Sequence, residues 1–155
     1  MKNTTQINLE ISKLKYKENV NFINEITQLI QTNYSFDSSK FFDFQAINFI
    51  SAVLTYLIVN KKHNKIIKIN DVRKFFECID LETNNEISSI YDFEGDLVKS
   101  SLMIQMEKLY FFNNIEVEDF IKKYINDNGL IMCKMCKNAN KTFSSIVNLI
   151  LNKIN

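Results

Sequence analysis

The sequence predicts an all-α domain, a single helical bundle of about five to seven helices around one central apolar helix, spanning residues 1–155. Proline is absent and glycine occurs only twice. This excludes the tight turns of sandwiches and barrels and the glycine-rich loops that hold phosphates or dinucleotides. Apolar residues make up 46% of the chain and recur mainly at three- and four-residue steps, the period of a helix. A chain of this length suffices for one domain with a sizeable core.

The first element is expected to be extended, because apolar and polar residues alternate at its start. The alternating apolar positions are Ile7, Leu9 and Ile11. Residues 1–17 are therefore predicted to form a short strand or an extended lead-in. At Glu18 the period changes to that of a helix, whose apolar stripe begins with Val20. A turn capped by Ser38 or Ser39 separates this helix from the next.

The residues from about 40 to 60 predict the central helix. Its polar side chains lie close to one narrow face: Gln45, Asn48, Ser51 and Thr55. Apolar side chains cover most of the remaining circumference: Phe41, Phe44, Ile47, Leu54, Leu57 and Ile58. A helix that is apolar over so much of its surface is typical of the centre of a bundle. Because polar residues interrupt the stretch, Asp43 among them, it falls short of a transmembrane span, and no membrane insertion is expected.

The middle of the chain separates positive from negative charge. Residues 61–70 form a basic connector before a short helix capped by Asn70. The connector contains Lys61, Lys62, Lys65 and Lys68. Residues 80–96 predict an acidic loop that contains Glu82, Glu86, Asp92, Glu94 and Asp96. The lysines are candidate contacts to DNA phosphates or to a partner, the carboxylates are candidate contacts to a basic protein, and ordinary solvation is the alternative for both sets.

The C-terminal half predicts further helices. Helical spacing resumes at Leu97 and again over residues 116–126, and Gly129 is typical of the position just after a helix. A final helix is expected over about residues 141–154. The segment 128–155 carries four lysines and no acidic side chain, so it forms a second basic region.

The sequence contains no pattern that indicates catalysis, a metal or a cofactor. Cys133 and Cys136 form a CxxC pair, but Cys78 and His63 do not form the second close pair that a zinc site uses, so we expect ordinary thiols and no metal. An activated nucleophile, an acid–base pair and a cofactor loop are all missing, so the chain is not expected to be an enzyme.

Composition predicts a soluble chain in the cytoplasm. Three cysteines are too few for a disulfide framework, and the first residues are polar rather than the apolar run of a signal peptide. The formal net charge of +1 gives no overall attraction to nucleic acid or membrane, so any such contact would have to be local.

Two segments resemble a known family. Residues 41–57 read FFDFQAINFISAVLTYL and resemble the aromatic helix in the all-α domain of type IV coupling proteins, with Ala46, Asn48 and Ala52 at the matching positions. Residues 139–146 read ANKTFSSI and resemble the Lys-Thr-x-x-Ser-Ile segment that closes the same domain. The order and spacing of the two segments also agree with the family.

The resemblance implies a docking role. Type IV coupling proteins are hexameric ATPases that bring DNA and protein substrates to conjugative secretion channels, and their all-α domain selects the relaxosome or effector. The expected partner is then a relaxosome component or a secreted protein, with DNA as a second partner, at the cytoplasmic face of the membrane. The motor's nucleotide-binding motifs are not present, so this chain alone is not expected to hydrolyse ATP. The alternative is a free-standing helical adaptor of viral or phage type that binds another protein.

Overall fold

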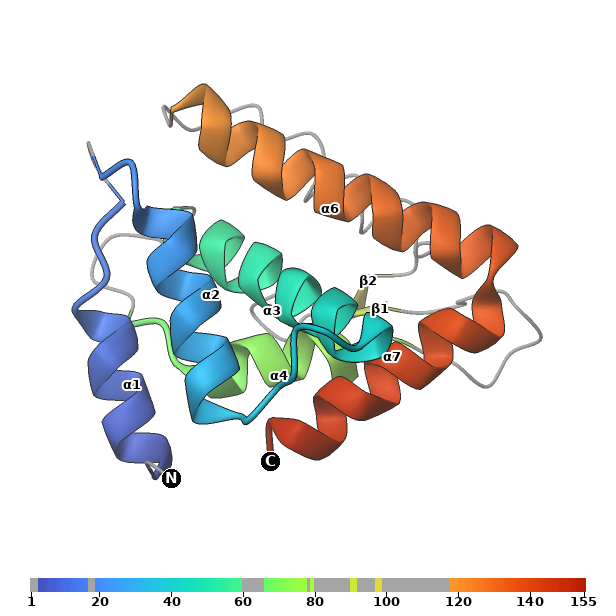
Figure 1. Cartoon of the computed structure of the whole chain (residues 1–155), viewed down its shortest axis with the longest axis horizontal. Coiled ribbons are helices and arrows are strands. Elements are labelled where there is room, and N and C mark those ends of the chain that lie inside the picture. Colours follow the sequence, from blue (N-terminus) through green and yellow to red (C-terminus); the bar gives the residue numbers. More distant parts are fainter. Residues whose placement is uncertain are drawn as a thin grey trace.

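The computed structural model describes residues 3–16, 19–59, 66–77, 79, 90–91, 97–98 and 118–155. These residues form helices α1 (Thr4–Ser12), α2 (Phe22–Asn33), α3 (Phe41–Val59), α4 (Ile69–Glu77), α6 (Asp119–Asn138) and α7 (Asn140–Lys153), as Figure 1 shows. Two short strands, β1 (Ile90–Tyr91) and β2 (Leu97–Val98), pair antiparallel. The predicted all-α class with one central apolar helix is confirmed.

Helix α3 lies at the centre and contacts α2, α4, α6 and α7 (Figure 1). Every residue from 49 to 59 is buried, and the rings of Phe49 and Phe143 from α7 lie 6.5 Å apart. Of the described helices, α3 alone is long and apolar enough to cross a membrane by length and composition, but 72% of its most apolar 18-residue stretch is buried inside the protein. That burial is typical of a core helix.

The N-terminal segment is helical, and the predicted extended lead-in is wrong for residues 4–12. Asn3 and Gln6 form a capping box, in which each side chain accepts a hydrogen bond from the other residue's backbone N–H. Ile7 and Ile11 are buried one turn apart, whereas Leu9 is exposed. The buried positions therefore follow a period of four rather than two, and the intervening Leu9 made the sequence look like a strand.

Helix α2 begins later than predicted, and Val20 is exposed rather than part of its buried stripe. Phe22 takes the first core position of this helix. Preceding it, Asn19 folds back and donates a side-chain hydrogen bond to the Glu25 carboxylate (Nδ2 to Oε2, 3.2 Å). The chain therefore turns before the helix starts.

Helix α6 continues through Gly129, so the predicted helix end at this glycine is wrong. The buried stripe of α6 contains Ile121, Ile125, Asn128, Met132 and Cys136. These positions follow steps of three and four residues on both sides of Gly129. A glycine in a helix interior costs about 1 kcal/mol relative to alanine, and packing of this continuous stripe outweighs that cost.

The helical spacing predicted from Leu97 is wrong for Leu97 and Val98, which belong to β2. They pair with Tyr91 and Ile90, two residues that the sequence placed in the acidic loop. β-Branched and aromatic residues favour this extended pairing. The remainder of the predicted loop and the helical spacing at 101–109 lie outside the described residues.

Arg73, the chain's single arginine, joins α4 to the end of α7. Its Nη1 donates to the Leu151 carbonyl (2.8 Å) and to the Ile154 carbonyl, and its Nε donates to Glu77. The last carbonyls of a helix have no partner within the helix, so the guanidinium satisfies groups that would otherwise need water. At the other end of α4, the Ile69 amide donates to Asn8 Oδ1 (2.9 Å), and the predicted cap at Asn70 is replaced by this contact from α1.

We predict that Arg73→Ala lowers the free energy of unfolding by about 1–2 kcal/mol, because charge-assisted hydrogen bonds to two carbonyls are lost. Arg73→Lys is expected to recover only part of this loss, since one ammonium lacks the guanidinium's forked donors. Urea unfolding followed by circular dichroism measures both variants. The exposed neighbour Lys74→Ala is the control, and an Arg73→Ala variant as stable as this control would contradict the assignment.

Candidate functional site

The start of α3 is its exposed end. Phe41 is 56% exposed, Phe44 is 48% exposed and Phe42 is 44% exposed, whereas the second half of the same helix is buried. The Phe41 and Phe42 rings pack edge to face, with their centroids 5.5 Å apart. The prediction that Phe41 and Phe44 belong to the core surface of the helix is therefore wrong. Three adjacent, half-exposed aromatic side chains are an unusual surface for a monomer and indicate an interaction site.

The turn before α3 holds these aromatic residues in place. The Asp37 carboxylate accepts hydrogen bonds from the Ser39 hydroxyl (2.6 Å) and amide (3.0 Å), which lower the pKa of Asp37. The Asp37 amide in turn donates to the Asp43 carboxylate in the first turn of α3 (2.8 Å). Aspartates, rather than the predicted serine cap, therefore organise this helix start, where a negative charge also suits the helix dipole.

Phe41 and Phe44 lie on the side of α3 that faces α6. At about 100° per residue, they share this side with the predicted polar positions Asn48, Ser51 and Thr55. Ser51 and Thr55 are fully buried. The Tyr124 hydroxyl of α6 lies 3.4 Å from Asn48 Oδ1, a long hydrogen bond. The narrow polar side of α3 is therefore covered by α6 instead of solvent, and we call this contact the α3–α6 seam.

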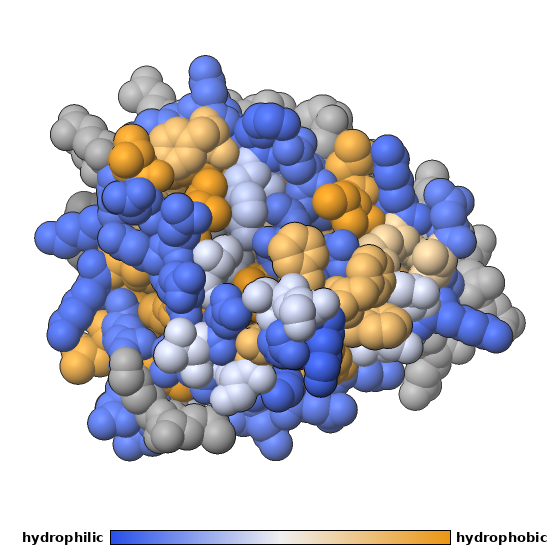
Figure 2. Space-filling view, viewed as in Figure 1, coloured by the Kyte–Doolittle hydropathy of each residue, from blue (hydrophilic) through white to orange (hydrophobic). Residues whose placement is uncertain are grey.

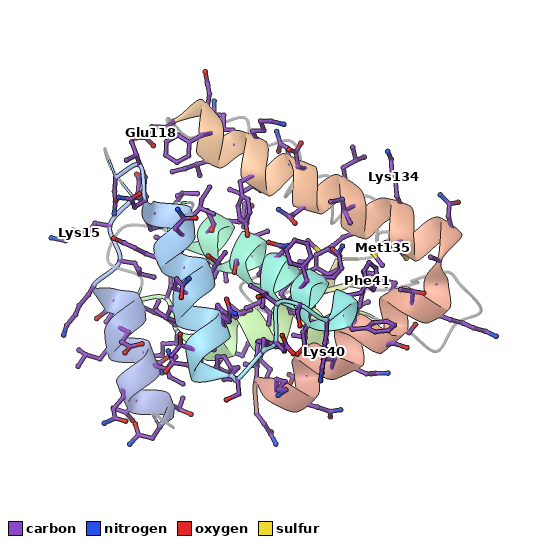
Figure 3. The ribbon with its side chains drawn as sticks, viewed as in Figure 1. Lys15, Lys40, Phe41, Glu118, Lys134 and Met135 are labelled. Carbon is purple, nitrogen blue, oxygen red and sulfur yellow. The ribbon has the colours of Figure 1, made fainter. Side chains whose placement is uncertain are left out.

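Helix α6 supplies the other half of the exposed surface. Ile131 and Met135 follow Tyr124 at helical steps, so they lie on the same flank of α6 and face the seam where Phe41 and Phe44 lie. Ile131 is 38% exposed and Met135 is half-buried against the core. We call Phe41, Phe44, Ile131 and Met135 the aromatic patch. Figure 2 shows hydrophobic atoms gathered between α6 and α7 over the start of α3, and Figure 3 shows Phe41 and Met135 there.

Lysines border the aromatic patch. Lys40 precedes Phe41 and Lys134 precedes Met135, and both are exposed at its margins (Figure 3). The nearest carboxylate on α6, Asp127, already pairs with Lys123 (2.8 Å). Asp43 points about 130° away from the patch around α3 and accepts the Asp37 amide. The patch is therefore apolar at its centre, and its rim carries Lys40 and Lys134, with the exposed Asp37 carboxylate close enough to Lys40 to interact with its charge.

The residues singled out from charge are not brought together by the described part of the structure. Lys68 is exposed, and its amide donates to the Asp71 carboxylate (2.8 Å). Three of the basic candidates lie outside the described residues: Lys61, Lys62 and Lys65. The acidic candidates also lie outside them: Glu82, Glu86, Asp92, Glu94 and Asp96. A role for either set stays a prediction.

The cysteine pair lies within α6. Cys136 is buried, and burial raises the pKa of its thiol, which keeps it protonated and unreactive. The side chains of Cys133, Cys78 and His63 are outside what the structure describes. Within the described residues, no group of three or more His, Cys, Asp or Glu side chains is placed to hold a metal ion.

Ile131 and Met135 were missed from the sequence, although a signal for them existed. Both follow Tyr124 on one helical flank, and the chain carries no acidic side chain after residue 127. The helical steps from Tyr124 could not be extended to residues 131–135 as long as the helix was expected to end near Gly129, because those residues then lay outside the helix.

The buried tyrosines give the fold a dependence on alkaline pH. Burial raises the pKa of Tyr124, with the neighbouring Ser51 hydroxyl opposing the rise, and raises the pKa of Tyr34 at the end of α2 to about 12. The unfolded chain ionises tyrosine near pH 10. The contribution of these two phenols to stability is therefore complete below pH 10 and is lost as the pH rises from about 10 towards 12.

We predict that Tyr124→Phe and Tyr34→Phe each make this alkaline loss of stability shallower, because a phenylalanine has no proton to release. Urea unfolding at a series of pH values from about 9 to 12 measures the slope for each variant and for the unchanged chain. Equal slopes for all three proteins would contradict the assignment.

Comparisons with known proteins gave no match for this chain. No family model, no curated protein and no solved structure matches this sequence or this fold significantly. The geometry of the aromatic patch is therefore the basis for the functional argument, and the likeness of residues 41–57 and 139–146 to coupling proteins stays a resemblance.

Proposed function

We propose that this chain is a protein-docking domain that binds its partner through the aromatic patch. The observation that carries the proposal is the exposure of Phe41 and Phe44 at one end of a helix whose residues 49–59 are all buried. The start of α3 is fixed by the Asp37 and Asp43 hydrogen bonds, so the rings are presented on a rigid element. Rigid aromatic residues are the side chains that most often anchor protein interfaces.

Energetics support the same conclusion. Full burial of a phenylalanine side chain stabilises a protein by roughly 1.5–3 kcal/mol, and the half-exposed rings of Phe41 and Phe44 realise only part of that in the isolated domain. A partner that covers both rings gains the remainder. Ile131 and Met135 extend the same apolar surface on α6, so a partner contacts two helices at once.

The proposal predicts site-specific cross-linking. A photo-reactive amino acid in place of Phe41 or Phe44 is expected to give the same discrete adduct in the source cells. One in place of Leu9, which is equally exposed on α1, is expected to give none. Adding Phe44→Ser to the Phe41 cross-linker is expected to reduce the adduct strongly while leaving the unfolding free energy within about 1 kcal/mol. Equal adducts from all three positions would contradict docking at the patch.

A finer proposal names the partner as a relaxosome component or secreted substrate of a type IV coupling protein. It is supported by the resemblance of residues 41–57 and 139–146, two segments that lie on the contacting helices α3 and α7. The free-standing adaptor is the second candidate, and the exposed apolar patch favours it, because an adaptor needs no further domain to use such a surface.

The size of the native protein separates these two candidates. An antibody raised against this domain is expected to detect a membrane-associated protein far larger than 18.3 kDa if the domain belongs to a coupling protein. A soluble protein of about the mass of this chain would contradict the coupling-protein proposal and support the adaptor. Denaturing electrophoresis of membrane and soluble fractions measures both quantities.

A further inference from the structure

We infer that the aromatic patch binds an amphipathic helix of a partner protein, with apolar residues along one face and Asp or Glu at both margins of that face. The inference rests on the proposed docking function and adds the chemistry of the partner. It follows from the shape of the patch, from the charges around it and from how far its side chains are already covered.

The patch has the shape that a third helix fits. Helices α3 and α6 run in opposite directions past each other (Figure 1), and each contributes about one turn to the patch: Phe41 with Phe44, and Ile131 with Met135. Elsewhere the seam between these helices is closed by small or polar residues such as Ser51 and Thr55. A helix laid across the exposed end, with anchors at steps of three and four residues, continues the helix-on-helix packing of the domain.

The charges around the patch select an acidic partner. Lys40 borders it on the α3 side and Lys134 on the α6 side. Of the carboxylates near these lysines, Asp127 is paired with Lys123 and Asp43 accepts the Asp37 amide. Asp37 accepts two hydrogen bonds from Ser39, and Lys40 lies close enough to it to help lower its pKa. Residues 128–155 add no acidic side chain. A bound helix with carboxylates at its margins therefore places them next to these lysines and is attracted. A bound helix with lysines at its margins is repelled, because it places like charges together.

The side chains of the aromatic patch are already half covered by the domain, and this favours a partner helix over an anionic bilayer as the surface that the patch binds. Close to half of each ring of Phe41 and Phe44 is already packed against the domain, and Met135 is packed against the core. Side chains that are half covered in this way are suited to a packed partner helix, whereas membrane anchors project into the acyl region. Binding to anionic vesicles is therefore the contrasting outcome.

The test uses three fluorescent peptides of about 18 residues, or five helical turns. The first has leucine and phenylalanine on one helical face and glutamate at its margins, the second replaces every glutamate with lysine, and the third redistributes the residues of the first around the helix. Fluorescence anisotropy measures their affinity for the whole chain. Two double variants with reversed charges are compared. The first combines Lys40→Glu and Lys134→Glu. The second, the control, combines Lys15→Glu and Lys68→Glu, so it has the same net charge but changes exposed lysines away from the patch.

The first peptide is expected to bind at least about 10-fold more tightly than the other two, and more weakly at high salt. Reversal at Lys40 and Lys134 is expected to invert the preference for acidic over basic peptide, whereas the control reversal leaves it unchanged. Phe41→Ser with Phe44→Ser is expected to abolish binding of the first peptide.

Two results would overturn the inference. One is equal binding of acidic and basic peptides, or no binding of either. The other is that the unchanged chain sediments with anionic vesicles and that the double variant Phe41→Ser/Phe44→Ser does not. The proposed docking function stands or falls separately, because the cross-linking at Phe41 and Phe44 does not depend on the charge of the partner.

Discussion

The burial of α3 is the constraint on which the rest of the fold depends. Eleven consecutive residues, 49–59, are removed from solvent, and no single neighbouring helix covers a surface that extends around the whole circumference. Helices α2, α4, α6 and α7 must therefore pack around it. The outer helices also contact one another, α6 with α7 and α4 with α7, and Arg73 adds hydrogen bonds from α4 to carbonyls at the end of α7. Helix α3 contributes more buried apolar residues to the core than any other single described helix, and burial of such residues drives folding.

The same helix creates the exposed surface, because its side chains change in size along the side that faces α6. Ser51 and Thr55 are small and fully buried, and Thr55 satisfies its hydroxyl by donating to the Ser51 carbonyl (2.6 Å). Towards the start of α3 the same side carries Phe41 and Phe44. About half of each of these side chains stays exposed, which leaves an aromatic surface at the start of the central helix. The core and the candidate docking site thus share one helical face.

How much of the site was predictable differs from residue to residue. Hydrophobicity and period identified Phe41 and Phe44 as apolar positions of α3, but not which of them the neighbouring helices cover. Ile131 and Met135 were missed although they follow Tyr124 at helical steps, because a glycine normally signals a helix end and α6 continues through Gly129. Charge directed attention to Lys61 and Glu82 and their neighbours. Lys40 and Lys134 gain significance only because the fold places them beside the patch.

By itself, the sequence determined the all-α class and the central position of α3, since both follow from local period and from a stretch of apolar residues too wide for one partner helix. It also placed α7 within one residue of its observed limits. The tertiary structure decided that residues 4–12 are helical, that the polar side of α3 is covered by Tyr124 and its neighbours, and that the aromatic start of α3 remains exposed. Which face a helix buries depends on the surfaces that distant segments bring to it, and those contacts are not encoded in its local pattern.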